Sequence, residues 1–120
     1  MIKEAKVRFS VIVPVHNRED YISDTLNSVL KQDFDNYEII CVDDCSTDNT
    51  VNIIKEYQKK DSRVVLIELD KTSSAFIARK RGIEKAKGEY ILFLDSDDSL
   101  TENGLSVVDE ALKKDTVDIL

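Results

Sequence analysis

The stretch Tyr37-Glu38-Ile39-Ile40-Cys41-Val42, followed directly by Asp43 and Asp44, decides the fold. Its apolar core is continuous rather than alternating, which is the pattern of a strand that is covered on both faces. Similar β-branched or aromatic runs occupy residues 7–15, 64–69 and 90–94. Strands of this kind are typical of parallel sheets, because the crossover connections place helices on both faces. The sequence therefore predicts four strands of one mainly parallel sheet.

The segments between these runs carry apolar residues at helical spacing. The first shows it most clearly, with Ile22, Leu26, Val29 and Leu30 on one side. A second helix is expected after residues 46–48, which offer N-caps, a third over about residues 74–87 with Gly88 at its C-terminal end, and a fourth over about residues 102–114. Residues 117–120 read as the start of a fifth strand, and an ending on this apolar run indicates a truncated chain. Strand and helix alternate, which predicts an open α/β sheet with helices on both faces.

Length and composition limit the function classes. The 120 residues suffice for one domain, and 42% of them are apolar. The net charge of −7 repels phosphate backbones, so nucleic acid is not expected as a partner. No apolar stretch approaches the roughly 20 residues that cross a bilayer, and we expect a cytoplasmic protein. Cys41 and Cys45 are predicted to be a buried thiol and a loop thiol rather than a disulfide or a zinc site.

Acidic residues gather at the predicted carboxyl edge of the sheet, where open α/β folds bind their ligands. The residues that follow the four strands are 14–17, then Asp43 and Asp44, then 70–72, and then 95–98. The three glycines of the chain form neither a dinucleotide fingerprint nor a P-loop. An anionic ligand at this edge would therefore have to be bound by something other than a glycine-rich loop. Clustered carboxylates supply an alternative by binding Mg²⁺ or Mn²⁺, which takes oxygen ligands from protein and phosphate together.

The spacing of Asp95 and Asp97 favours such an ion. Side chains two apart at the end of a strand share a face, so these two carboxylates can converge. Two such charges about 4 Å apart repel by ~4 kcal/mol at an effective dielectric constant near 20, and a cation removes that cost. The alternative is a polar turn whose aspartates cap the next helix.

Four other residues also allow two interpretations. Asp43 or Asp44 could cap a helix, or could accept a hydrogen bond from a ring N–H of a nucleotide base. His16 could be an ordinary loop histidine, and Arg79 could belong to a solvated basic face. The residue pattern alone leaves these alternatives open.

Four motifs together resemble the N-terminal half of a family-two glycosyltransferase with the A-type, Rossmann-like fold. They occupy residues 10–17, 42–48, 78–83 and 88–98, and the resemblance covers roughly residues 8–118. It implies transfer of a sugar from a nucleotide diphosphate, usually a uridine one, to an acceptor hydroxyl with inversion at the anomeric carbon. Cell-surface polysaccharide synthesis fits this class, and glycan, lipid-linked and protein acceptors are all open.

The resemblance also implies roles for single residues. The residues implied to bind the nucleotide are Pro14, Val15, His16, Asn17, Asp44, Arg79, Asp95 and Ser96. Among these, His16 stands where an aromatic ring often stacks on the base, and Asp44 would accept the imide N–H. Asp97, with Asp95, would hold the Mg²⁺ or Mn²⁺ that bridges the two phosphates. The third helix departs from the family pattern, since Thr72, Ser74 and Lys80 stand where asparagine, glycine and asparagine are common.

The resemblance places the general base downstream of Leu120. Residues 1–120 are thus expected to form a single nucleotide-diphosphate-sugar-binding domain that lacks the acceptor part and is inactive alone. Peripheral attachment of a full-length protein to a membrane stays open, and the sequence does not indicate an oligomeric state. The alternative function is a phospho-acceptor receiver domain with an acidic Mg²⁺ pocket. That fold wants its acidic pair after the first strand, where this chain has Pro14 and His16.

Overall fold

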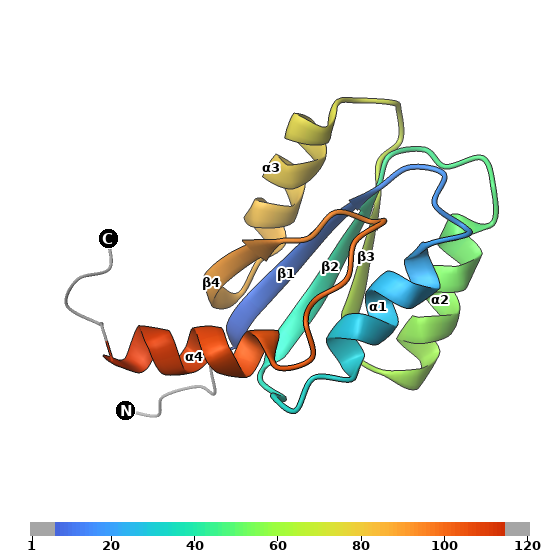
Figure 1. Ribbon diagram of the computed structural model, residues 1–120. Coiled ribbons are helices and arrows are strands. Elements are labelled where there is room, and N and C mark those ends of the chain that lie inside the picture. The colour runs from blue at the N-terminus through green and yellow to red at the C-terminus, as the bar shows by residue number, and fades with distance from the viewer. Residues whose placement is uncertain (1–6, 115–120) are drawn as a thin grey trace.

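A computed structural model describes residues 7–114 and shows alternating strands and helices (Figure 1). The strands are β1 (Val7–Val15), β2 (Tyr37–Asp43), β3 (Val64–Glu68) and β4 (Gly88–Phe93). The helices are α1 (Ile22–Leu30), α2 (Thr50–Lys60), α3 (Ala75–Lys85) and α4 (Gly104–Lys114). All strand pairs are parallel, in the order β3-β2-β1-β4. The predicted open parallel α/β sheet is confirmed.

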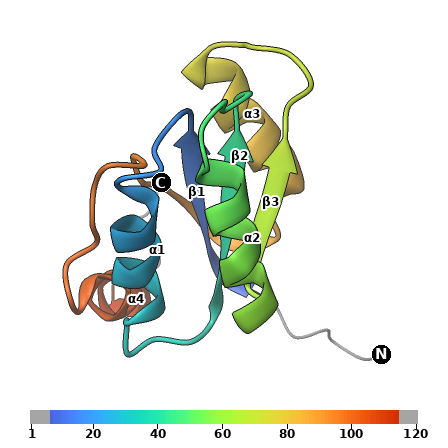
Figure 2. The ribbon, with the colours of Figure 1, turned by 90° about the vertical axis from the view of Figure 1, so that its right-hand side faces the viewer.

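Helices cover both faces of this sheet (Figure 2). On one face α1, α2 and α4 pack against a core built around Phe9, Val11 and Val13 of β1. On the other face α3 contributes Ala78 to a smaller core with Ile12 and Ile40. Successive residues of β1 and β2 therefore enter different cores, which explains why their sequences are continuously apolar. These two strands contribute most of the buried hydrophobic residues, and a fully buried isoleucine or phenylalanine stabilises the fold by about 1.5–3 kcal/mol.

Strand β4 differs from the prediction, because the described residues 7–114 cover only one of its faces. Its residues alternate between half-buried and exposed, with Ile91 37% and Phe93 50% exposed. Within residues 7–114 it is an edge strand, and α3 packs over β1 and β2 instead of over β4. Phe76 and Ile83 of α3 are also exposed beside it and line a hollow of about 440 Å³ together with Phe93. The expectation of coverage on both faces is therefore wrong for this strand.

Gly88 also has a different role from the one predicted. The helix α3 ends at Lys85 with Ala86 as an extended C-cap, and Gly88 is the first residue of β4 without a positive φ. A Cβ atom at Gly88 would lie 2.5 Å from the backbone N of Ser10. The Gly88 N–H donates to Ser10 Oγ at 2.8 Å. Glycine is needed here because the backbone at the start of β4 lies too close to the backbone of β1 to leave room for a side chain.

The structure leaves one predicted strand undescribed and bears on the search for membrane-spanning helices. The predicted fifth strand, residues 117–120, lies outside the described residues. Within residues 7–114, no helix has the length and apolar character needed to cross a bilayer.

Candidate functional site

The carboxyl edge of the sheet brings together the loops after β1, β2 and β4. In the parallel register Val15 lies opposite Asp43, and Ile12 lies between Ile40 and Phe93. The ends of β2 and β4 are separated only by β1, which is two strand spacings or roughly 10 Å. The predicted rim of acidic residues therefore exists as one edge.

Hydrogen bonds tie the loop after β1 to the loop after β2. Asn17 has a positive φ of 50°, and its Oδ1 accepts from the backbone N–H of Thr47 at 2.7 Å and of Asp48 at 3.3 Å. His16 Nδ1 lies 2.6 Å from the backbone O of Asp44. The side chains of His16 and Asn17 are thus exposed at the edge but already engaged with the neighbouring loop. Of the other residues predicted to line the base, Pro14 is half-buried and Val15 is buried.

The two aspartates at the end of β2 have different environments; Asp43 is the last residue of the strand and Asp44 follows it. Asp43 is only 3% exposed, and its carboxylate accepts from Ser46 N at 3.0 Å and from Ser46 Oγ at 2.5 Å. Asp44 is half-buried, and its Oδ1 accepts from the backbone N–H of Ser73 at 2.8 Å. Asp43 thus organises its own loop, while Asp44 holds the loop that precedes α3. No other hydrogen bond within residues 7–114 uses the second oxygen of Asp44, Oδ2.

The N-terminus of α2 depends on Asp48. Its Oδ1 accepts from the N–H of Thr50 at 3.0 Å and from Thr50 Oγ1 at 2.5 Å. The N-cap is Asn49, whose side chain makes no capping hydrogen bond, so the prediction of an N-cap among residues 46–48 is wrong. Its Oδ2 accepts from Glu19 N at 3.2 Å. Partial burial raises the pKa of this carboxyl, but these hydrogen bonds outweigh burial, and the net pKa lies below its usual value of 3.8.

The loop after β4 carries the acidic cluster. Carboxylate oxygens of Asp95, Asp97 and Asp98 lie within 4.8 Å of one another, and all three side chains are exposed. Ser96 between them is 6% exposed, so its side chain turns inward as the two-residue alternation predicts. Three hard oxygen ligands on one exposed loop fit Mg²⁺ or Mn²⁺, which also keep water and phosphate ligands. The convergence of Asp95 and Asp97 is confirmed.

Arg79 of α3 lies beside the acidic cluster and forms an ion pair with Asp95. Its Nη2 lies 3.8 Å from Asp95 Oδ1, and its guanidinium carbon lies 5.9 Å from the centre of the Phe93 ring. Helix α3 is therefore connected to both acidic loops, through Ser73 just before it and through Arg79 within it. Both partners are largely exposed, so the ion pair itself contributes little to stability.

Sequence reasoning missed a row of polar side chains on α1, namely Thr25, Ser28 and Gln32, the last just past the end of the helix. All three hydrogen-bond to the chain between β4 and α4. Their signal in the sequence is weak: they are polar residues beside the apolar stripe formed by Ile22, Leu26 and Val29. Only the tertiary structure shows what they bind.

Neither cysteine forms a disulfide, and the two lie in different environments. Burial, and secondarily the nearby Asp43 charge, raises the pKa of the Cys41 thiol to about 12, so it stays protonated at neutral pH. Cys45 Sγ donates to the carbonyl oxygen of Leu69 at 3.3 Å. Both thiols are free, as predicted.

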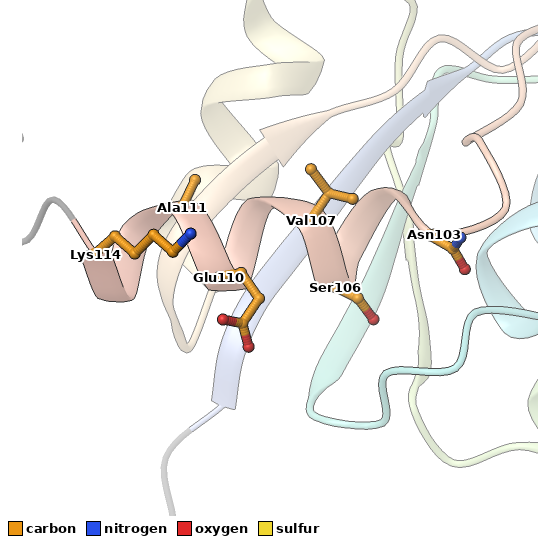
Figure 3. Close-up of a pocket in the computed structure, with 6 residues that line it drawn as sticks. All are labelled: Asn103, Ser106, Val107, Glu110, Ala111 and Lys114. Atoms are coloured by element: carbon orange, nitrogen blue, oxygen red, sulfur yellow. The ribbon is translucent and has the colours of Figure 1, made fainter.

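A hollow of about 540 Å³ lies away from this edge, along the outer side of α4 (Figure 3). Its lining residues recur at helical spacing on one side of a single helix and its preceding turn: Asn103, Ser106, Val107, Glu110, Ala111 and Lys114. None of them is a predicted site residue. It is a shallow helix face rather than a candidate active site.

Comparison with known proteins gives a consistent result. Residues 10–120 match the family model described as glycosyl transferase family 2. TuaG of Bacillus subtilis (strain 168), a protein assigned by name to teichuronic acid biosynthesis, is 47% identical over 96 residues, which are 80% of this chain and 38% of TuaG.

Solved structures match as well. Staphylococcus aureus TarS 1-349 in complex with UDP has a TM-score of 0.84 at 38% identity, over 89% of this chain and 32% of that one. The same TarS fragment with UDP-GlcNAc has a TM-score of 0.77. The mannosyltransferase PcManGT of Pyrobaculum calidifontis, solved with GDP-Man and Mn²⁺, has a TM-score of 0.74 at 25% identity, over 81% of this chain and 29% of that one. The chain thus spans between 29% and 38% of TuaG and of these solved chains.

Proposed function

The chain belongs to glycosyl transferase family 2, and we propose that it is the donor-binding part of an enzyme that transfers a sugar from a nucleotide diphosphate to an acceptor hydroxyl. The observation that carries the proposal is the group of exposed carboxylates of Asp95, Asp97 and Asp98, whose oxygens lie within 4.8 Å of one another. Like charges so close together favour a divalent cation and, through it, a diphosphate.

Uridine is the proposed base, and Asp44 its main recognition group. The Oδ1 atom of Asp44 is engaged by Ser73, whereas Oδ2 is available to accept the imide N–H of uracil. The loop with Pro14, Val15, His16 and Asn17 lies directly beside Asp44 and would line the base. The UDP and UDP-GlcNAc complexes of TarS support this choice of nucleotide, since TarS shares the fold and 38% of the matched sequence.

The diphosphate is proposed to lie at the end of β4. Asp97 and Asp95 would hold Mg²⁺ or Mn²⁺, which supplies Lewis-acid stabilisation of the charge on the leaving diphosphate when bound. The Mn²⁺ complex of PcManGT supports a divalent ion in this fold. Arg79 lies next to Asp95 and adds a positive charge on the same side. Ser96 would contribute through its backbone, because its side chain is buried.

The remaining parts of the reaction are proposed to lie outside these 120 residues. An inverting displacement needs a carboxylate that removes the acceptor proton. We propose that this base and the acceptor site come from the part of a longer protein that the matched relatives contain and this chain does not cover. A glycan acceptor of a cell-surface polymer fits the names of the relatives.

The test is calorimetric titration of the folded chain with UDP, with and without Mn²⁺. Wild-type protein should bind UDP in the presence of Mn²⁺. Asp97→Ala should weaken this binding about 100-fold, because it removes a direct metal ligand, and the loss of a residue that only supports a ligand already weakens binding by about 10–100-fold. Asp35→Ala is the matched control, because Asp35 is an exposed aspartate before β2, at the opposite edge of the sheet. Equal binding without metal, or in Asp97→Ala, would contradict the assigned site.

The positions of the acidic residues at the carboxyl edge of the sheet do not favour a receiver domain. In the structure β1 is followed by His16 and Asn17, and the acidic pair follows β2. Stable labelling of an aspartate by acetyl phosphate would be needed to reopen that alternative.

A further inference from the structure

The loop with the acidic cluster has no regular secondary structure, yet its backbone is firmly held. Residues 94–103 lie between β4 and α4, and three side chains at helix α1 bond to this segment and to the start of α4. We call Thr25, Ser28 and Gln32 the polar row. Each bond joins residues about seventy positions apart, so the row is a tertiary feature and not a local turn.

Thr25 is the member of the polar row that bonds to the acidic loop itself. It is 1% exposed, and its Oγ1 lies 2.9 Å from the carbonyl oxygen of Ser96 and 2.8 Å from that of Asp98. The Ser96 carbonyl belongs to the peptide group that precedes Asp97, and the Asp98 carbonyl belongs to the one that follows Asp98. A single hydroxyl hydrogen is therefore shared between the two ends of the short segment that carries Asp97 and Asp98.

Ser28 and Gln32 extend this anchoring to the start of α4. Ser28 Oγ accepts from Leu100 N at 3.0 Å. Gln32 Nε2 donates to the carbonyl oxygen of Thr101 at 2.7 Å, and its Oε1 accepts from Leu105 N at 3.0 Å in the first turn of α4. The buried amide of Gln32 thus satisfies one of the N–H groups that a helix N-terminus leaves unpaired.

We propose that the polar row is the frame that fixes the spacing of the Asp95, Asp97 and Asp98 carboxylates, with Thr25 as the positioning residue for the divalent cation. This inference rests on the proposed function. All anchoring bonds go to backbone atoms, so they leave the carboxylates of Asp97 and Asp98 available to a ligand, while the Asp95 carboxylate faces Arg79 at 3.8 Å. Groups that orient metal ligands commonly change metal affinity by 10–100-fold when they are removed, although they never touch the ion.

The variant Thr25→Val distinguishes a Thr25 hydroxyl that positions the metal ligands from one that only stabilises the fold. Valine keeps the shape and the branching of threonine but removes the hydroxyl, whereas Thr25→Ser keeps the hydroxyl. If the row positions the ligands, Thr25→Val should weaken binding of Mn²⁺ with UDP by about 10-fold, and Thr25→Ser should restore most of it. Ser10→Ala is the control, because it removes another fully buried hydroxyl, that of Ser10 near the opposite end of β1.

The measurement is calorimetric titration of UDP at saturating Mn²⁺, together with hydrogen exchange of peptides that cover residues 96–105 and β2. We expect Thr25→Val to exchange faster in residues 96–105 with β2 unchanged, and Ser10→Ala to keep wild-type affinity. Wild-type affinity in folded Thr25→Val would overturn the inference and leave the proposed function intact. If Thr25→Val also loses protection in β2, Ser28→Ala takes its place with the same two criteria.

A wild-type chain that binds no UDP with Mn²⁺ would contradict the proposed function itself. In that case hydrogen exchange still tests whether the polar row holds the acidic loop. Unchanged protection of residues 96–105 in Thr25→Val would overturn the inference independently of any ligand.

Discussion

The loops after β2 and after β4 both place aspartates at the same edge of the sheet, but they are held in opposite ways. In the loop after β2, the carboxylates themselves make the anchoring bonds, Asp43 to Ser46 and Asp44 to Ser73. In the loop after β4, Thr25 binds backbone carbonyls, and the carboxylates of Asp97 and Asp98 make no ion pair or hydrogen bond within residues 7–114. The same residue type is structural in one loop and available to a ligand in the other.

This difference indicates how a rim of similar charges can have separate roles. A carboxylate that accepts backbone N–H bonds is already stabilised as an anion and gains little from a cation. A group of exposed carboxylates without such donors keeps its mutual repulsion, which a bound cation relieves. Where the anchoring bonds of a loop come from is therefore a guide to which of its acids bind ligands.

Removal of Asp43 should have the largest effect on stability. Asp43→Ala leaves the buried end of β2 without the acceptor for Ser46 N and Ser46 Oγ, and we expect a loss of about 2–3 kcal/mol in the free energy of unfolding. Asp98→Ala should lose almost nothing without metal, because it removes an exposed charge that repels its neighbours. Denaturant unfolding of both variants in metal-free buffer measures the contrast. Equal losses would show that the two loops do not differ as described.

Asp44 combines both roles, and Asp44→Asn should separate them. The asparagine oxygen can still accept from Ser73 N, so stability should stay within about 1 kcal/mol of wild type. Its amide now presents a donor to the base, which opposes the imide N–H of uracil and suits the ring nitrogen acceptor of cytosine. We therefore expect UDP affinity to fall about tenfold and CDP affinity to rise relative to it. Calorimetry with the two nucleotides checks this, with Asp44→Ala as the variant that loses both contacts.

An unchanged ratio of UDP to CDP affinity in Asp44→Asn would remove Asp44 from base recognition. It would leave its bond to Ser73 as its only role.

The smallest expected effect concerns pH and Asp48. Its folded-state pKa is lowered by the hydrogen bonds at the start of α2, so it contributes stability that is present above the unfolded value of 3.8 and is lost as pH falls through the folded value. Asp48→Asn should therefore be less stable than wild type near pH 6, and the difference should shrink below pH 3.8. Thermal unfolding over this pH range measures it. A difference that stays constant would show that the charge of Asp48 contributes nothing.

The sequence predicted most of the architecture, because burial on two faces leaves a local signal. The strand β1 occupies the predicted residues, and the alternation of Asp95, Ser96 and Asp97 was enough to predict which side chains converge. The exposure of β4 could not be predicted, since its apolar run reads like those of β1 and β2. Whether a second layer covers a strand depends on neighbours that the run itself does not encode.

The less predictable part of the site consists of long-range hydrogen bonds. Asn17 was predicted to line the base, and the sequence did not indicate that its side-chain oxygen also bridges to Thr47 and Asp48. Thr25 was not distinguished from other polar helix residues, although it determines how the acidic loop is held. Both residues act across loops that are close only in the folded chain.

The uncovered side of β4 has a practical consequence for solutions of this chain. An edge strand offers unpaired backbone groups to other molecules; β4 is such a strand in the part of the chain that the structure describes, and Ile91 and Phe93 add apolar area to it. Edge-to-edge association should therefore increase with protein concentration and compete with refolding. A lysine in place of Ile91 would act as a gatekeeper charge and keep the chain dispersed.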